Sequence, residues 1–334
     1  MFLDFLLHEM TALRYYIPLI QEARKSSIKC NVYISRSGKY NDPHKYLELL
    51  SLLCFRYDFN VLSVENLLGR ENPIVTLEHS GLGNLPPLNK KQKIITVTYA
   101  TNFAMPGAYK NYSDKSDCIL APSKYFAEYY NVNFKNTYFL GISKFDVKLD
   151  KVQICKKYDI SQEHKKVLII YPKPRDAHKV DLHQIYKDLR LKGYSILVKT
   201  RGKDPVSSDF LRGDHYFEDY SWHPHTTMEL ISVSDLIINF GSCAIEECVM
   251  LAKPVIDFRV KPFDERGFEK LYHYDYAKTL QTTFTQEEFT ESIDFLTSSD
   301  FEKEFKKAQK ECLVDSSFNS SNSIINFIKE ELYS

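Results

Sequence analysis

The stretch SDLIINFGSCAIEECVMLAKPVIDF (234–258) contains the features that decide the fold. It opens with a short run of large apolar residues (235–240), continues with a Gly-Ser pair and an amphipathic segment (243–252), and closes with a second apolar run (254–258). Short apolar runs separated by a helix-length segment are typical of buried parallel strands joined by a crossover helix. The stretch therefore predicts a βαβ unit within a parallel sheet.

The same alternation extends from this unit along the rest of the chain. Strands are expected at 2–7, 29–35, 59–64, 73–78, 93–98, 117–121, 136–141, 167–172, 195–200, 235–240 and 254–258. Helices are expected at 9–25, 43–57, 123–131, 181–192, 226–234 and 243–252, with three more near 285–298, 301–312 and 320–332. This order of elements predicts an α/β protein with parallel sheets and crossover helices.

A polar, lysine-rich stretch (146–164) interrupts the pattern. Because 334 residues exceed the usual size of one hydrophobic core, the interruption predicts two Rossmann-like domains, residues 1–149 and 150–334. The last expected helix, 320–332, could return along the chain path and pack on the first domain. Open α/β sheets bind ligands at the carboxyl ends of their strands, so we expect the two domains to face a central cleft that holds the ligand.

The charge balance and the cysteines narrow the functional class. Equal numbers of basic and acidic side chains, 44 of each, leave no overall field that would favour nucleic acid. The seven cysteines form no Cys-x-x-Cys pair, which suits reduced thiols in a cytoplasmic compartment. The N-terminal ten residues lack a basic start and contain Asp4, so they predict a first strand rather than a signal peptide. No run approaches the roughly 20 apolar residues of a membrane span, so any membrane association is expected to be peripheral, at the inner membrane face.

The turn after the first apolar run of the 234–258 unit is a candidate anion site. Gly241, Ser242 and Cys243 stand where a helix is expected to begin, and free backbone N–H groups there would suit a diphosphate. Glu246 and Glu247 follow, and a carboxylate can accept two ribose or sugar hydroxyls. The alternative is an ordinary βαβ unit in which Ser242 caps the helix and the two glutamates complement its dipole. The residues alone favour neither interpretation.

Four basic residues follow expected strands of the second half. Lys173 and Arg175 come after the strand 167–172, and Lys199 and Arg201 lie at the end of the next strand. Each alone would be an ordinary solvated charge. Together on one sheet edge they would stabilise the charge of a diphosphate leaving group.

Three residues of the first half are candidates for proton transfer. His79 follows the strand 73–78 and precedes a glycine-containing loop, where a neutral imidazole could take the proton of an acceptor hydroxyl. The alternative is a histidine with a structural hydrogen bond in that loop. His8 and Glu9 follow the first strand and are second-rank candidates, because both could instead stabilise the start of a helix.

Several motifs occur in an order that resembles one enzyme family. They are EHSGLGNLP (78–86), SDCILAPSKYFAEYY (116–130), YFLGISKFD (138–146), IIYPKPRD (169–176), GYSILVKTRGKDP (193–205), the 234–258 unit and DERG (264–267). This succession, over roughly residues 75–270, is similar to that of the CDP-glycerol glycerophosphotransferases of the GT-B superfamily. The 234–258 unit alone is also similar to UDP-N-acetylglucosamine 2-epimerases.

The sequence departs from the family pattern at three motifs. The family's His-Gly is His-Ser-Gly here (79–81), the histidine of its Lys-x-His-Pro is Arg201, and its Asp-Tyr-Ser-Ser is Asn-Phe-Gly-Ser (239–242). Arginine is a good bidentate donor to phosphate, so phosphate binding is compatible with these changes. They favour a sugar-nucleotide transferase over a strict glycerophosphotransferase.

The resemblance implies a GT-B fold and a transferase of polysaccharide biosynthesis. Such an enzyme would move a sugar or polyol phosphate from a CDP-, CMP- or UDP-linked donor to a glycan or glycolipid acceptor. We expect no metal and no separate cofactor, because the chain has no P-loop, dinucleotide-binding or Asp-x-Asp motif. The alternatives are a non-hydrolysing sugar-nucleotide 2-epimerase and a GT-B protein that binds a sugar nucleotide or glycan without catalysis.

Overall fold

The computed structural model describes most of the chain, which falls into two compact units. The described residues are 1–78, 82–98, 113–122, 135–201, 206, 213–218, 221–258, 260, 278–298, 301, 303 and 319–332. Unit 1 comprises Met1–Val147 and Leu313–Ser334, and unit 2 comprises Lys148–Cys312. His79, the expected helix 123–131 and the DERG motif (264–267) lie outside the described residues.

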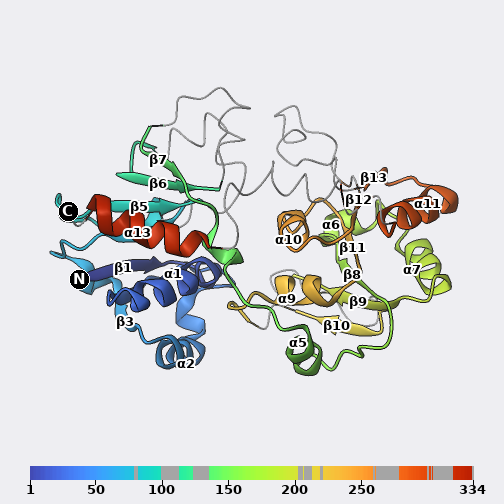
Figure 1. The fold of residues 1–334 in the computed structure, drawn as a ribbon, viewed down its shortest axis with the longest axis horizontal. Helices are drawn as coiled ribbons and strands as arrows, with labels where there is room; N and C mark the ends of the chain where they lie inside the picture. Colours follow the sequence, from blue (N-terminus) through green and yellow to red (C-terminus); the bar gives the residue numbers. More distant parts are fainter. Residues whose placement is uncertain are drawn as a thin grey trace. The chain divides into compact units, whose positions relative to one another are not determined.

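Unit 1 is built on a seven-stranded sheet in the order β3-β2-β1-β4-β5-β6-β7 (Figure 1). All its strand pairs are parallel. The strands are β1 (Phe2–Leu7), β2 (Lys29–Ile34), β3 (Asn60–Ser63), β4 (Ile74–Leu77), β5 (Ile94–Val97), β6 (Cys118–Ala121) and β7 (Thr137–Phe139). The described helices are α1 (Leu13–Lys25), α2 (Leu47–Tyr57) and α13 (Ser320–Leu332), with 3-10 turns η1 (Met10–Ala12), η2 (Pro43–Lys45), η3 (Val64–Leu67), η4 (Leu82–Asn84) and η6 (Ser143–Phe145).

The inner strands of the first sheet are covered on both faces, which explains why β1 and β4 are buried without alternation. Five of the six residues of β1 and all four of β4 are buried. Parallel sheets need this composition because crossover helices pack on both sides of them. Helix α1 buries Leu13, Ile17 and Ile20, whose spacing of three to four residues places them on one face.

Unit 2 repeats the design with a six-stranded parallel sheet in the order β10-β9-β8-β11-β12-β13 (Figure 1). Its strands are β8 (Lys166–Ile170), β9 (Ser195–Lys199), β10 (His215–Phe217), β11 (Leu236–Asn239), β12 (Val255–Phe258) and β13 (Lys278–Leu280). Its described helices are α5 (Lys151–Lys157), α6 (Pro174–Ala177), α7 (Leu182–Leu191), α9 (Thr226–Val233), α10 (Ile245–Met250) and α11 (Gln286–Leu296).

The last helix of the chain belongs to unit 1. Figure 1 shows α13, drawn in red, beside α1, and the two helices are in contact. Asp146, in the chain segment that leaves unit 1, accepts hydrogen bonds from the backbone N–H groups of Ser320 and Ser321 at 3.2 and 2.5 Å. A carboxylate from a distant part of the sequence therefore caps the start of α13.

The expected α/β fold of two Rossmann-like halves is confirmed, and several details differ from expectation. The helices expected at 9–25 and 43–57 begin at Leu13 and Leu47, after the turns η1 and η2, and α6 was not expected. Most of the helix expected near 301–312 lies outside the described residues. The short edge strands β10 and β13 were not expected. The lysine-rich stretch 146–164 contains α5, which Asp150 caps by accepting from the N–H groups of Val152 and Gln153. Helix α10 begins at Ile245 rather than at residue 243, because residues 241–244 form a turn that side chains of the sheet hold in place.

In the described part of the chain, no helix has the length and apolar character needed to cross a bilayer.

Candidate functional site

Both sheets have a point where the strand order reverses, and the candidate residues gather at these points. In unit 1 the order reverses between β1 and β4, and in unit 2 between β8 and β11. Loops leave two such strands in opposite directions, which opens a crevice at their carboxyl ends where α/β proteins bind ligands. His8 and Glu9 follow β1, Lys173 follows β8, and Ser242 follows β11.

A row of polar side chains crosses the carboxyl edge of the second sheet. Lys199 pairs with Ile170 of β8, and Asn239 pairs with Asp257 of β12. Ile169 pairs with Ile238, so the next residue of β11, Asn239, is level with Ile170. Lys199, Asn239 and Asp257 are therefore level with one another at the ends of otherwise apolar strands, and each is at most 6% exposed.

Asn239 and Asp257 fix the turn that follows β11. The Asn239 amide donates to Asp257 Oδ1 at 2.6 Å and to the carbonyl of Ser242 at 3.0 Å. The Gly241 N–H donates to the same Asp257 oxygen at 2.9 Å. Gly241 has φ +63°, a left-handed conformation that costs glycine little. The turn is thus rigidly placed before any ligand arrives.

The far side of this turn faces solvent. Gly241 and Cys243 are exposed and Ser242 is half-buried. The Ser242 hydroxyl accepts only a long hydrogen bond, 3.4 Å, from the Ala244 N–H, and its backbone N–H has no acceptor among the described residues. Ser242 is not the N-cap of α10, because Ala244 takes that position without a side-chain bond. The bond from the Ala244 N–H to Ser242 Oγ is itself a weak capping contact, so the capping interpretation of Ser242 stays a prediction.

Glu246 and Glu247 lie in the first turn of α10 and are buried, at 2% and 4% exposure. Both side chains have interaction partners in the protein. Their position just beyond the turn agrees with the sequence expectation that carboxylates follow it.

The four basic residues differ in their surroundings. Lys199 is buried, and its ammonium donates to the carbonyl of Thr200 at 3.1 Å. Lys173 and Arg201 are half-buried. Arg175 is the outlier, because its side chain is 72% exposed and its Nε lies 3.7 Å from Asp176. Lys173, Lys199 and Arg201 follow the neighbouring strands β8 and β9, so they share one part of the sheet edge.

At the carboxyl ends of the strands of the first sheet, the His8 side chain contacts Ser35, the residue that follows the neighbouring strand β2. The His8 side chain is 7% exposed, and its Nδ1 lies 2.9 Å from Ser35 Oγ. Burial lowers the pKa of the imidazole, since desolvation disfavours the cation, while the nearby Glu9 acts in the opposite direction. His8 is therefore neutral at pH 7.

Glu9 is fully engaged in holding the same edge together. Its Oε1 accepts from Lys39 Nζ at 2.5 Å, and its Oε2 accepts from Asn41 Nδ2 at 3.0 Å. Burial alone would raise the pKa of the carboxyl, but the bonds from Lys39 and Asn41 and the Lys39 charge outweigh it and lower the pKa. A carboxylate of this kind is a weak proton acceptor.

The remaining candidate for proton transfer is His79. Its neighbour Glu78 directly follows β4, next to β1 in the sheet, and is fully buried. His79 itself lies outside the described residues.

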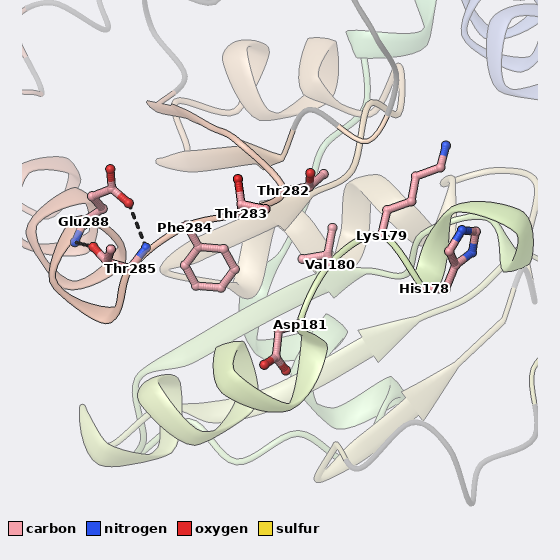
Figure 2. Close-up of a pocket in the computed structure, with 9 residues that line it drawn as sticks. All are labelled: His178, Lys179, Val180, Asp181, Thr282, Thr283, Phe284, Thr285 and Glu288. Atoms are coloured by element: carbon pink, nitrogen blue, oxygen red, sulfur yellow. Dashed lines mark hydrogen bonds between the residues drawn. The ribbon is translucent and has the colours of Figure 1, made fainter.

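A separate cavity of about 710 Å³ lies in unit 2 between residues 178–181 and the segment before α11 (Figure 2). Its polar groups have local structural tasks. Asp181 caps α7, and Thr285 and Glu288 form the capping box of α11. Lys179 donates to Asp176 and to the carbonyl of Val260. We therefore do not assign this cavity to the ligand.

Comparison with solved structures identifies the architecture. UDP-GlcNAc 2-epimerase from Neisseria meningitidis, bound to UDP-GlcNAc, aligns with a TM-score of 0.64 at 14% identity, covering 98% of this chain and 99% of that one. The wall teichoic acid polymerase TagF, soaked with CDPG, aligns with 0.62 at 14% identity, covering 99% and 88%. The glycotransferase of kitacinnamycin aligns with 0.62 at 8% identity, covering 99% of each chain. The chain has a GT-B-like fold.

This result confirms the resemblance inferred from the motif order. The neighbours include both transferases and epimerases, and at these identities they establish the fold alone. No protein-family model and no curated protein matches the chain.

Sequence reasoning missed the residues that support the candidates. Asn239 and Asp257 each end or nearly end an apolar strand, and a polar residue in that position was the available signal. Ser35 stood at the end of the expected strand 29–35, level with the end of the first strand. The roles of Lys39 and Asn41 had no signal, because they depend on the path of a loop.

Proposed function

We propose that the protein is a GT-B type transferase that moves a sugar or polyol phosphate from a nucleotide-activated donor to a glycan or glycolipid acceptor. The observation that carries the proposal is the preformed turn at the β8/β11 reversal point of unit 2, with cationic side chains beside it. Its fold neighbours include a structure that holds UDP-GlcNAc and one soaked with CDPG. A CDP-, CMP- or UDP-linked donor is the corresponding ligand class for this chain.

Unit 2 supplies the donor contacts in this proposal. On the exposed side of the turn, the backbone N–H and the hydroxyl of Ser242, between Gly241 and Cys243, offer donors to a phosphate oxygen. Lys173, Lys199 and Arg201 stabilise the negative charge that develops on the phosphate of the leaving nucleotide, which is UDP for a UDP-sugar and CMP for a CMP-sugar or a CDP-linked polyol. Arg175 joins them by rotating its exposed side chain. Glu246 and Glu247 form the carboxylate end of the donor site, nearest the ribose or sugar hydroxyls.

Unit 1 supplies the proton acceptor. His8 suits this role better than Glu9, because a neutral imidazole can take a proton whereas both Glu9 oxygens hold other residues. His79 stays a prediction from the sequence. Replacing each histidine with alanine decides between them, since loss of the base lowers turnover by about 10²–10⁴-fold.

The proposal includes no metal and no separate cofactor, because the basic side chains Lys173, Lys199 and Arg201 supply the positive charge for the phosphates. The acceptor belongs to polysaccharide biosynthesis, and the place of action is the cytoplasm or the inner face of the membrane, with peripheral attachment only. Nucleic acid is not a partner, given the equal numbers of acidic and basic residues.

A second function is favoured by the similarity to the UDP-GlcNAc-bound 2-epimerase. A non-hydrolysing epimerase would use the same unit 2 turn and would invert the sugar at C2. A protein that binds a sugar nucleotide without catalysis is the third alternative.

One incubation experiment separates the three functions. The protein is incubated in D2O with UDP-GlcNAc and, separately, with CDP-glycerol. Slow release of UDP from UDP-GlcNAc, or of CMP from CDP-glycerol, supports the transferase, because transfer of glycerol phosphate from CDP-glycerol leaves CMP. Deuterium at C2 of the recovered sugar nucleotide supports the epimerase and would overturn the proposal. Binding with neither change supports the non-catalytic protein.

A further inference from the structure

The contact between His8 and Ser35 leaves one nitrogen of the imidazole for chemistry. Nδ1 lies 2.9 Å from Ser35 Oγ, and Nε2 has no hydrogen-bond partner among the described residues. Which nitrogen of a histidine carries the proton is set by the bond that the other nitrogen makes. The Ser35 hydroxyl can accept from a protonated Nδ1 or donate to an unprotonated one, so the direction of this bond and the tautomer of His8 are linked.

Strand register brings the two residues together. Leu7 of β1 pairs with Ile34 of β2, and the Ser35 N–H donates to the Leu7 carbonyl at 3.1 Å. His8 and Ser35 are thus each the first residue beyond two neighbouring parallel strands. Their contact rests on the sheet and not on a flexible loop.

The loop after Ser35 is fastened to the loop after His8 at two more points. Glu9 binds Lys39 and Asn41 through its side chain, and the Met10 N–H donates to the Asn41 carbonyl at 2.9 Å. Asp42 closes the same loop by accepting from the Gly38 N–H at 2.9 Å. These bonds restrict how far Ser35 can move away from His8.

The charged groups that act on His8 come from both loops. They are Glu9 beside it and Lys39 and Asp42 from the loop after β2. Glu9 and Asp42 favour the imidazolium, while burial and Lys39 disfavour it. The neutral imidazole prevails, and so its tautomer determines whether Nε2 accepts or donates a proton.

We propose that Ser35 is the positioning residue for His8. Its hydroxyl accepts a hydrogen bond from Nδ1–H and so keeps the lone pair on Nε2, the nitrogen that takes the proton from the hydroxyl of the glycan or glycolipid substrate. Glu9 supports this arrangement by holding the loop that begins at Ser35. This role of Ser35 deepens the proposed function and rests on it for the identity of the reaction. The tautomer of His8 does not depend on the proposed function.

The tautomer is measured without any substrate. Full-length protein labelled with 15N-histidine gives one pair of nitrogen shifts for each of its 10 histidines, and His8→Gln identifies the pair that belongs to His8. The expected result is a protonated Nδ1 and an unprotonated Nε2 at pH 7.5. Ser35→Ala shifts this ratio, Ser35→Thr restores it because the hydroxyl is kept, and the control Ser37→Ala leaves it unchanged.

Nucleotide release from UDP-GlcNAc or CDP-glycerol provides the functional readout. Ser35→Ala should lower turnover about 10-fold, a part of the 10²–10⁴-fold that a general base contributes. Ser35→Ala loses a hydrogen-bond acceptor that stabilises the His8 imidazolium more than the neutral ring, so the pKa of His8 falls. The acid limb of the pH–rate profile should therefore move to lower pH. Ser35→Thr and Ser37→Ala should retain the wild-type profile.

The outcomes separate this inference from the proposed function. A protonated Nε2 in the wild type, unchanged in Ser35→Ala, overturns the role of Ser35 whatever the reaction is. The expected tautomers without turnover of either nucleotide contradict the proposed transferase and leave the positioning of His8 established. Turnover that is equal in Ser35→Ala and the wild type overturns the functional part of the inference.

Discussion

At the scale of single residues, Asp4 is unusual because it is a fully buried carboxyl in the middle of β1. It accepts from the Asn31 amide at 2.8 Å and from the Asn72 amide at 3.2 Å. Burial raises its pKa, and the two amides counteract this only in part. The folded protein therefore holds the proton of Asp4 more tightly than the unfolded chain does.

This shift predicts a pH dependence of stability. Because the pKa is higher in the folded state, protonation of Asp4 stabilises the fold fully below the unfolded pKa of about 3.9, and this contribution is lost as the pH rises through the folded pKa. Asp4→Asn removes the titration. Urea unfolding from pH 7 to pH 4 should therefore show the wild type gaining stability relative to Asp4→Asn. The exposed Asp114→Asn serves as control, and parallel curves for wild type and Asp4→Asn would refute the prediction.

The donor turn gives a second prediction at this scale. Ser242→Ala and Glu246→Ala should each weaken nucleotide affinity by about 1–3 kcal/mol, the cost of losing a buried polar contact. Isothermal titration with UDP-GlcNAc and CDP measures this. Thr283→Ala, in the separate cavity, should bind normally. If Thr283→Ala bound the nucleotide more weakly while Ser242→Ala and Glu246→Ala bound it normally, the binding site would be assigned to that cavity.

At the scale of secondary-structure elements, β11 and β12 are joined at their ends by the Asn239 amide and the Asp257 carboxylate, 2.6 Å apart. Asn239→Asp puts two carboxylates at this distance in a buried place. Chemical unfolding should show a loss of about 1–3 kcal/mol at pH 7. The loss should shrink in acid, where one carboxyl is protonated. Asn66→Asp, at an exposed position, is the control. An unchanged free energy of unfolding in Asn239→Asp would show that the bond between Asn239 and Asp257 does not hold the turn.

Helix α13 depends on a cap from a distant part of the chain. Asp146→Ala removes the acceptor of the Ser320 and Ser321 N–H groups and should cost about 1–2 kcal/mol. Hydrogen exchange should rise in α13 but not in α5. Asp150→Ala, which uncaps α5, should do the reverse. Equal exchange of α13 in the wild type and Asp146→Ala would mean that packing on α1 alone holds the helix.

Elements with long apolar patterns could be predicted from the sequence. The stretches VLIIYP, DLIINF and PVIDF are mostly apolar without alternation, as a doubly covered sheet requires, and β8, β11 and β12 form there. The edge strands β10 and β13 have three residues each, too few to show a pattern. Their pairing is decided by neighbours that are far away in the sequence.

The candidate site was predictable only where it lies at strand ends. His8, Lys199 and Ser242 follow apolar runs, so their edge of the sheet could be inferred from the order of elements. The pairing of Asn239 with Asp257 and of Glu9 with Lys39 could not, because it depends on strand order and loop path. The start of α10 was placed too early for the same reason, since the turn before it is held by Asp257 of the neighbouring strand, which bonds to Asn239 and Gly241.

At the scale of the whole molecule, unit 2 is a continuous insertion into unit 1. The chain leaves unit 1 after Val147 and returns at Leu313. Each unit has its own parallel sheet with its own reversal point, so each can offer a ligand edge of its own. The proposed division of labour, with the donor on unit 2 and the proton acceptor on unit 1, follows from which side chains occupy these two edges.

The central claim, that the carboxyl edge of unit 2 binds a nucleotide-activated donor, is tested most directly by hydrogen exchange of the full-length protein with and without UDP-GlcNAc or CDP-glycerol. The claim predicts that at least one of these ligands slows exchange in peptides that cover residues 239–247 and 199–201. Exchange in the cavity segment 282–285 should stay unchanged. No protection by millimolar concentrations of either ligand, or protection confined to unit 1, would contradict it.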